Sequence, residues 1–134
     1  MNILFVCKHN VFRSRVAEAY FKAINQNKNL KASSAGPIKG GDCSKNQKKA
    51  LKEEKIKFIS KPKCLSTKLL EKQDLTIIVA DDISINLFNN KDYNKRIVHW
   101  NVPDVLDDDK QKSHETIQLI KKKVKELVKK YNKD

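Results

Sequence analysis

Near its beginning the chain reads Ile3-Leu4-Phe5-Val6-Cys7-Lys8-His9-Asn10-Val11-Phe12-Arg13-Ser14. The first four of these residues form a short apolar run, which predicts a fully buried strand. From Ser14 onward the apolar residues are spaced so that they fall on one face of a helix. They are Val16, Ala19, Tyr20, Ala23 and Ile24. A strand, a polar loop and a helix are therefore expected to follow one another at the start of the chain.

The same alternation continues along the rest of the sequence. Apolar runs predict strands at residues 30–34, 75–80 and 96–100. Helices are predicted at residues 44–55, which open with the capping-box spacing of Ser44 and Gln47, at 67–71 and at 83–88. The last segment carries one helical stripe of Ile117, Ile120, Val124, Leu127, Val128 and Tyr131.

Strands that alternate with helices imply right-handed crossovers and a parallel sheet covered on both faces. We therefore expect a three-layer α/β/α fold with a four-stranded parallel sheet. The length of 134 residues, without repeats or low-complexity segments, predicts a single domain over residues 1–134.

Composition excludes several classes of protein. No apolar stretch approaches the roughly 20 residues of a membrane-spanning helix, and the first apolar run is too short for a signal peptide. The three cysteines, Cys7, Cys43 and Cys64, are odd in number and far apart, which favours free thiols in a reducing cytoplasm. A cytoplasmic protein without a membrane partner is expected.

The formal net charge of +13 raises the question of nucleic-acid binding. Only Arg13, Arg15 and Arg96 are arginine, although arginine is the favoured residue for recognising phosphates and bases. The lysines are scattered along the chain, as expected of a solvated coat. The charge therefore argues against nucleic acid as the partner and points instead to electrostatic attraction of acidic ligands.

The loop from Cys7 to Ser14 has the composition of an oxyanion site. In a parallel sheet, ligands bind beyond the carboxyl ends of the strands. Backbone N–H groups in such a loop form a concave nest, and the N-terminus of the following helix adds positive potential. Arg13 offers a planar fork for two phosphate oxygens, and Asn10 tolerates the left-handed conformation that the loop needs. The same field favours Cys7 as a nucleophilic thiolate, although a cysteine at a strand end is more often simply buried.

This loop and several further segments resemble the low-molecular-weight protein tyrosine phosphatases and the thioredoxin-coupled arsenate reductases that share their fold. The matching segments are Ile3 to Ser14, Ala17-Glu18-Ala19, Ser34-Ala35-Gly36, Leu75 to Ala80 and Trp100-Asn101-Val102-Pro103-Asp104. The resemblance implies a phosphomonoesterase that acts on a phosphorylated protein or a small phosphate monoester. It implies no metal and no cofactor.

The resemblance also implies a role for each residue of the loop. Cys7 would form a phosphocysteine, Arg13 would stabilise the transition state, and Ser14 would hydrogen-bond the thiolate. Asp104 would act as general acid and then as general base. The loop residues Lys8, His9, Asn10, Val11 and Phe12 would surround the bound phosphoryl group.

The sequence departs from the family pattern in ways that leave alternatives open. Asp104 is followed by Val105 where the family has proline, and Asp81 is a reserve candidate for the acid. Asp81 and Asp82 are otherwise expected to cap the next helix, and the run Asp107-Asp108-Asp109 to supply N-terminal helix charge rather than a metal site.

The substrate is also open. Phe12 stands where family phosphatases carry a second cysteine, and no aromatic follows Asp104 or occupies the short loop at residues 37–41. An arsenate reductase that uses Cys43 or Cys64 as resolving thiol, with thioredoxin as partner, is the second hypothesis. A phosphate-binding or phosphoprotein-binding module without catalysis is the third.

The three histidines carry weaker expectations. His9 is expected at the pocket rim or facing solvent, His99 in packing beside Trp100, and His114 on a helix surface.

Overall fold

A computed structural model describes residues 1–88 and 96–132 of the chain. Its sheet contains β1 (Asn2–Val6), β2 (Lys31–Ala35), β3 (Leu75–Val79) and β4 (Ile97–Trp100) in the order β2-β1-β3-β4. Every neighbouring pair is parallel. The predicted four-stranded parallel sheet is confirmed, with each strand within one residue of the expected bounds.

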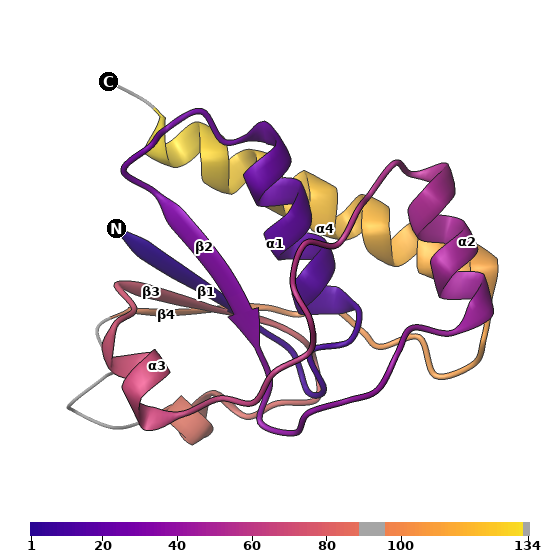
Figure 1. The fold of residues 1–134 in the computed structure, drawn as a ribbon, viewed down its shortest axis with the longest axis horizontal. Coiled ribbons are helices and arrows are strands. Elements are labelled where there is room, and N and C mark those ends of the chain that lie inside the picture. The colour runs from indigo at the N-terminus through magenta and orange to yellow at the C-terminus, as the bar shows by residue number, and fades with distance from the viewer. Residues whose placement is uncertain (89–95, 133–134) are drawn as a thin grey trace.

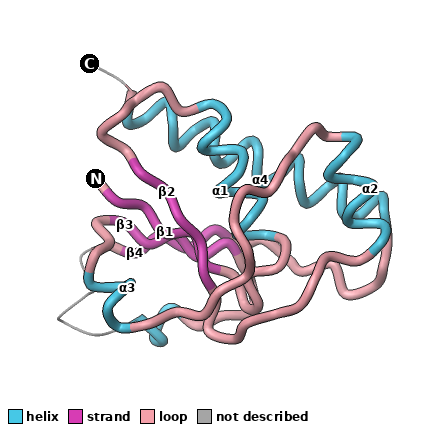
Figure 2. Tube along the Cα trace, in the orientation of Figure 1, coloured by secondary structure: helices cyan, strands magenta, loops and turns pink. Residues whose placement is uncertain are grey.

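Helices cover both faces of the sheet (Figures 1 and 2). On one face, α1 (Arg13–Ile24) packs against α4 (Lys110–Tyr131), and α2 (Lys45–Glu53) extends this layer by packing on α4. The short α3 (Thr67–Glu71) and the 3-10 helix η1 (Ile85–Phe88) cover the other face. The architecture is the predicted three-layer α/β/α arrangement.

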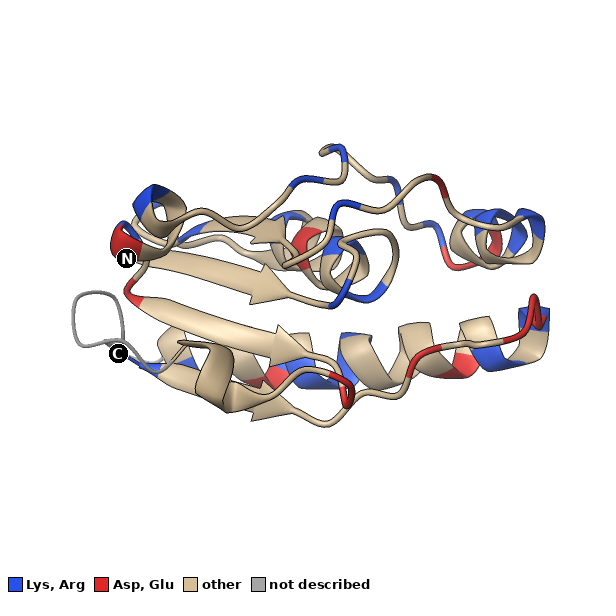
Figure 3. Ribbon diagram, turned by 90° about the horizontal axis from the view of Figure 1, so that it is seen from below, with Lys and Arg blue, Asp and Glu red and all other residues tan. Residues whose placement is uncertain are grey.

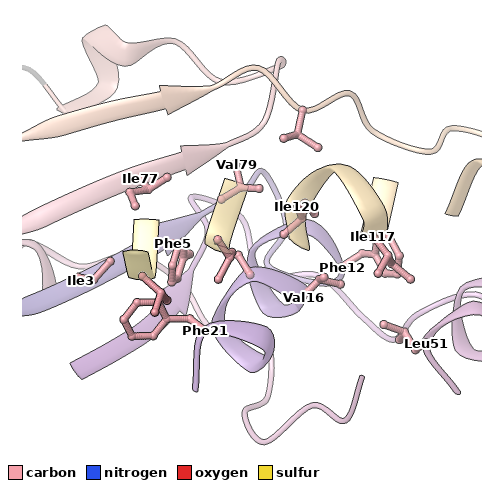
Figure 4. Packing of buried hydrophobic residues seen from close by; sticks show 14 of the residues in the cluster. Ile3, Phe5, Phe12, Val16, Phe21, Leu51, Ile77, Val79, Ile117 and Ile120 are labelled. Atoms are coloured by element: carbon pink, nitrogen blue, oxygen red, sulfur yellow. The ribbon is translucent and has the colours of Figure 1, made fainter. Parts of the chain in front are cut away.

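Alternating side chains of β1 supply both hydrophobic layers, because successive residues of a strand point to opposite faces. Ile3 and Phe5 join the larger cluster between the sheet and α1 and α4, whereas Leu4 and Val6 join the smaller one beneath α3 and η1. Figure 4 shows the larger cluster closing around Phe5. Burying an aliphatic or aromatic side chain of this kind stabilises the fold by about 1.5–3 kcal/mol. Packing on both faces therefore fixes the position of β1 and of the first residue of the loop that follows it.

Helix boundaries follow local capping chemistry. Ser44 accepts from the Gln47 N–H at 3.2 Å while its own N–H donates to Gln47 Oε1 at 3.0 Å, so the predicted capping box is present. The helix ends before Lys55, which has a left-handed φ of 59°. Asp109 caps α4 by accepting from the Lys112 N–H at 3.0 Å, in line with the interpretation of the acidic run.

The expected capping role of Asp81 and Asp82 is wrong. The helix predicted at 83–88 begins at Ile85, and Ser84 supplies its N-terminal acceptor by receiving the Asn86 N–H at 3.1 Å. The Asp82 carboxylate instead bonds Arg13. Ser84 is closer to the free N–H groups of the first turn, and a buried guanidinium is the stronger partner for a carboxylate.

In the part of the chain that the structure describes, no helix combines the length and the apolar composition needed to cross a membrane.

Candidate active site

The loop between β1 and α1 is held in shape by Asn10. Its φ of 53° lies in the left-handed region that asparagine tolerates, as the sequence predicts. Its side chain is fully buried and spans two segments, since Nδ2 donates to Ser14 Oγ at 2.7 Å and Oδ1 accepts from the Lys63 N–H at 3.0 Å. Asn10 therefore joins the loop to the start of α1 and to the segment before α3.

Two donors from Ser14 converge on the sulfur of Cys7. The distance from Cys7 Sγ to Ser14 Oγ is 3.0 Å, and the Ser14 N–H points at the same sulfur from 3.4 Å. Because Ser14 Oγ already accepts a hydrogen bond from Asn10, its own proton is available to the sulfur. The hydroxyl and the N–H of Ser14 therefore both contact the sulfur at the N-terminus of α1.

Hydrogen bonds to two carbonyls of the loop orient the peptides that follow them. The carbonyl of Lys8 accepts from the Ile38 N–H at 3.2 Å, and that of Phe12 accepts from the Val16 N–H at 2.8 Å. A trans peptide is planar, so each following N–H points the opposite way from such a bonded carbonyl. The N–H groups of His9 and Arg13 are thus turned away from these partners, and both residues line the cavity described below.

Gly36, at the end of β2, allows the neighbouring segments to approach this loop. A Cβ atom on Gly36 would lie 2.5 Å from the carbonyl oxygen of Cys7 and 3.0 Å from that of Lys8. Its backbone bonds residues 63 and 65 on its other side, through Gly36 N–H to Lys63 O at 3.0 Å and Leu65 N–H to Gly36 O at 2.8 Å. Only glycine fits between the catalytic loop and this outer segment.

A cavity of about 320 Å³ opens above the loop. Its lining residues are Cys7, His9, Val11, Phe12, Arg13, Gly40, Gly41, Gln47, Asp104 and Val105. Phe12 lines it mainly through its backbone, because the residue is 3% exposed and its side chain belongs to the main core. The wall of the cavity is therefore formed by polar and small residues.

Arg13 lies at one side of this cavity among three carboxylates. Its side chain is 3% exposed, and Nη2 donates to Asp82 Oδ1 at 3.1 Å and Oδ2 at 3.2 Å. Nη1 donates to the Val102 carbonyl at 3.0 Å and lies 3.7 Å from Asp81, and Nε lies 3.8 Å from Asp104 Oδ1. The loops after β3 and β4 therefore converge on a guanidinium that follows β1.

Basic and acidic residues near the pocket come from different loops. Figure 3 shows Lys and Arg in the loop after β1, and Asp and Glu in the loops after β3 and β4. Asp104 belongs to the second group and lines the cavity directly. Its Oδ1 accepts from the Val105 N–H at 2.9 Å and lies 3.8 Å from Arg13 Nε.

The structure brings Cys7, Arg13 and Asp104 together around the cavity and holds Ser14 and Asn10 behind it. His9 reaches the cavity wall. Among the predicted substrate-binding residues, His9, Val11 and Phe12 line the cavity, whereas Lys8 and Asn10 support the loop from outside it.

Cys43 and Cys64 are free thiols in different surroundings. Cys43 is buried, and its Sγ donates to the Val11 carbonyl at 3.5 Å. Burial raises the pKa of the Cys43 thiol to about 11, so it remains protonated at neutral pH. Cys64 is exposed and pairs through its backbone with Gly36.

Sequence reasoning missed two residues behind the loop, Arg15 and Glu18. Glu18 is buried and accepts from Ser34 Oγ at 2.6 Å and from Ser60 Oγ at 2.7 Å. Burial alone raises the pKa of Glu18, but hydrogen bonds from Ser34, Ser60 and Lys22 outweigh it and lower that pKa. One sequence signal could have identified Glu18 as a buried carboxylate. It lies between the two alanines of Ala17-Glu18-Ala19, on an otherwise apolar helix face.

Among the residues that the structure describes, no three His, Cys, Asp or Glu side chains gather closely enough to hold a metal ion.

Comparison with known proteins agrees with this geometry. The family model of the low molecular weight phosphotyrosine protein phosphatases matches residues 2–134. The chain belongs to this family. Among curated proteins, none matches the sequence.

Solved structures that resemble this family member include an arginine phosphatase, YwlE, in a mutant form with a phosphorylated active-site serine. That structure is 26% identical, with a TM-score of 0.84, and the match covers 100% of this chain and 97% of the other. An arsenate reductase from Archaeoglobus fulgidus is 27% identical, with a TM-score of 0.75 and coverage of 95% and 98%.

A low molecular weight phosphotyrosine phosphatase from Vibrio cholerae is 19% identical, with a TM-score of 0.85 and coverage of 99% and 97%, which shows the shared fold. Family membership and these structures together indicate a phosphatase.

Proposed function

We propose that this phosphatase hydrolyses phosphate monoesters in the cytoplasm through a phosphocysteine on Cys7. The observation that carries the proposal is the convergence of Cys7, Arg13 and Asp104 on one cavity. In the first step the Cys7 thiolate attacks phosphorus, an S–P bond forms, and the bond from phosphorus to the leaving oxygen breaks. Asp104 gives its proton to that leaving oxygen.

The second step returns the enzyme to its starting form. The Asp104 carboxylate takes a proton from water, the water oxygen bonds to phosphorus, and the S–P bond breaks. Inorganic phosphate leaves, and the sulfur is again a thiolate, stabilised by the two donors of Ser14. Throughout, the loop N–H groups and Arg13 stabilise the charge that develops on the phosphoryl oxygens.

Arg13 must turn part of its guanidinium from Asp82 toward the phosphoryl oxygens. The bonds from Nη2 to Asp82 are of ordinary length, and the Asp82 side chain is 31% exposed. A dianionic phosphoryl group carries more charge than one carboxylate and accepts two bonds from the guanidinium fork. Substrate therefore competes with Asp82 for a cation that is already close to the site.

The substrate proposed first is a protein phosphotyrosine, as the family name suggests. The carboxylates of Asp81 and Asp104 near Arg13 support a second candidate, phosphoarginine, because a cationic leaving group suits an acidic wall. The structurally similar arginine phosphatase gives this candidate added support. A peptide prepared in phosphotyrosyl and phosphoarginyl forms distinguishes the two by the ratio of kcat/KM values.

Arsenate reduction is the alternative that a structural relative supports. It requires a second thiol that attacks the Cys7–arsenic adduct. Cys43 is poorly suited, since it is protonated and bonded to the Val11 carbonyl, whereas Cys64 is accessible. Thioredoxin-coupled arsenate turnover that is unchanged in both Cys43→Ser and Cys64→Ser would remove this function.

The basic test of the phosphatase proposal is release of phosphate from an aryl phosphate. Wild-type enzyme is expected to turn over, and Cys7→Ser to lose this activity. Tight binding of inorganic phosphate without turnover in the wild type would instead identify a non-catalytic phosphate-binding module.

A further inference from the structure

Arg15 is a buried cation immediately behind the catalytic loop. The residue is 9% exposed, and its guanidinium carbon lies 4.1 Å from the centre of the Phe58 ring. Nη1 donates to the Val11 carbonyl at 3.1 Å and Nη2 donates to the Ser60 carbonyl at 2.8 Å. The side chain thus ties the loop to the segment 58–60 that lies against α1.

The charge of Arg15 is not neutralised by a carboxylate. Within residues 1–88 and 96–132, no acidic oxygen lies within 4.0 Å of its guanidinium. Its Nε is buried and has no hydrogen-bond partner among the same residues. Burying a cation that has no carboxylate in direct contact is costly, and nearby negative groups would offset that cost. A bound phosphate dianion and the Cys7 thiolate are negative groups on the pocket side of the same loop.

Arg15 also fixes the orientation of one peptide of the loop. The Val11 carbonyl receives both Arg15 Nη1 and the Cys43 thiol, which lies 3.5 Å away and stays protonated. Because the peptide is planar, two donors on the Val11 carbonyl turn the Phe12 N–H to the opposite side. Phe12 lines the cavity, and an N–H on the side opposite the bonded carbonyl is free to bind an anion there.

We propose that Arg15 is a positioning residue of the phosphate-binding loop. It holds the Val11–Phe12 peptide with its N–H toward the phosphoryl group. It also adds a second positive charge on the side of the loop opposite the anion, whereas Arg13 contacts the anion directly. The proposal rests on the proposed phosphatase function, but its effects on anion binding and on Cys7 reactivity exist without turnover.

The test compares Arg15→Gln and Arg15→Lys with Arg96→Gln, a matched variant of an exposed arginine that bonds only Tyr131 Oη at 3.2 Å among the described residues. Two readouts are independent of catalysis: the affinity for inorganic phosphate, by calorimetry, and the pH profile of Cys7 alkylation by iodoacetate, followed on the Cys7 peptide by mass spectrometry.

For Arg15→Gln we expect phosphate to bind about tenfold more weakly, as for loss of a hydrogen bond to a charged site, and Cys7 alkylation to require a higher pH. Arg15→Lys keeps the charge but loses the two-pronged bond, so it should restore the alkylation profile more than the phosphate affinity. Arg96→Gln should match wild type in both readouts.

A merely structural Arg15 would lower the melting temperature of Arg15→Gln and leave both readouts unchanged, and this result would overturn the proposal. If Arg15→Gln does not fold, the same two readouts are measured on Arg15→Lys and Phe58→Leu. Wild-type phosphate affinity and a wild-type alkylation profile in both variants would then overturn the proposal. If only the phosphatase function fails, wild type would still bind phosphate more tightly than Arg15→Gln does, but it would release no phosphate from an aryl phosphate.

Discussion

Nη2 of Arg13 donates to both carboxylate oxygens of Asp82, at 3.1 and 3.2 Å, so the arginine proposed to bind phosphate has a counterion within the protein. Arg13 is almost fully buried, and without this carboxylate its charge would be compensated only by the Val102 carbonyl and by more distant acids. Under the proposed function, Asp82 would stabilise the fold and compete with substrate through the same contact.

Replacement of Asp82 by asparagine should separate these two effects. We expect the free energy of unfolding of Asp82→Asn to fall by about 1–2 kcal/mol, because a buried guanidinium loses its charged partner. Inorganic phosphate should raise the melting temperature of this variant more than that of wild type, since it replaces the lost charge. Asp107→Asn, in an exposed loop, is the control. Equal phosphate-induced shifts in Asp82→Asn and wild type would contradict this view of Asp82.

The general acid can be identified by its dependence on the leaving group. Asp104→Asn should lower kcat by about a hundredfold for a poor leaving group such as an alkyl or tyrosyl oxygen, and much less for an activated aryl phosphate. Asp81→Asn should leave this dependence on the leaving group unchanged. The assignment of Asp104 is wrong if the leaving-group effect is found in Asp81→Asn and is missing in Asp104→Asn.

Asn10 combines a backbone and a side-chain role that two substitutions distinguish. Both Asn10→Gly and Asn10→Ala lose the bonds to Ser14 and Lys63, so kcat should fall about tenfold or more in each. Both replacements must adopt a φ of 53°, but only alanine is strained there, which should make Asn10→Ala less stable than Asn10→Gly by up to about 1 kcal/mol in urea unfolding. Wild-type turnover in both variants would exclude a role for Asn10 in orienting Ser14.

The contact between α2 and α4 predicts a pH optimum of stability. His114 Nδ1 lies 2.8 Å from Glu54 and Nε2 lies 2.7 Å from Glu53, an arrangement in which a protonated ring donates to a carboxylate from each nitrogen. These bonds raise the pKa of His114 from 6.5. Burial alone raises the pKa of Glu54, but bonds from His114, Gln118 and Lys121 outweigh it and lower that pKa to about 2.

The sign of the two effects follows from linkage. The contribution of His114 is fully present below pH 6.5 and is lost as the pH rises through its raised folded value. The contribution of Glu54 is present above pH 4.5 and is lost as the pH falls toward 2. In urea unfolding, His114→Gln should therefore lack the alkaline decline of wild type, whereas Glu126→Gln on the same helix should keep it. An alkaline decline that persists in His114→Gln would show that another group causes it.

Much of the fold was predictable from local patterns, because periods of two and of 3.6 residues identify strands and helices without knowledge of tertiary contacts. The left-handed Asn10 and the Ser44–Gln47 capping box were likewise local. The order of the strands was not predicted, and it is this order that brings the loops after β3 and β4 beside the loop after β1.

The residues that sequence reasoning missed act over long separations in the chain. Asp82 meets Arg13 across 69 positions, and Arg15 meets Ser60 across 45. The hydrophobic periodicity of the sequence carries no information on such contacts. Asp82 was therefore assigned to a local helix cap, and Arg15 was considered only for its charge. His114 was expected simply on a helix surface. Its position between Glu53 and Glu54 arises from the packing of α2 on α4, which is also a contact between distant parts of the chain.

The measurement that tests the central claim most directly is a denaturing quench of the enzyme during turnover of an aryl phosphate, followed by mass spectrometry of the peptide that contains Cys7. A phosphoryl group on Cys7 in the wild type, absent from a Cys7→Ser variant that no longer releases phosphate by turnover, is the predicted result. Turnover without any adduct on Cys7, together with undiminished activity in Cys7→Ser, would contradict the account.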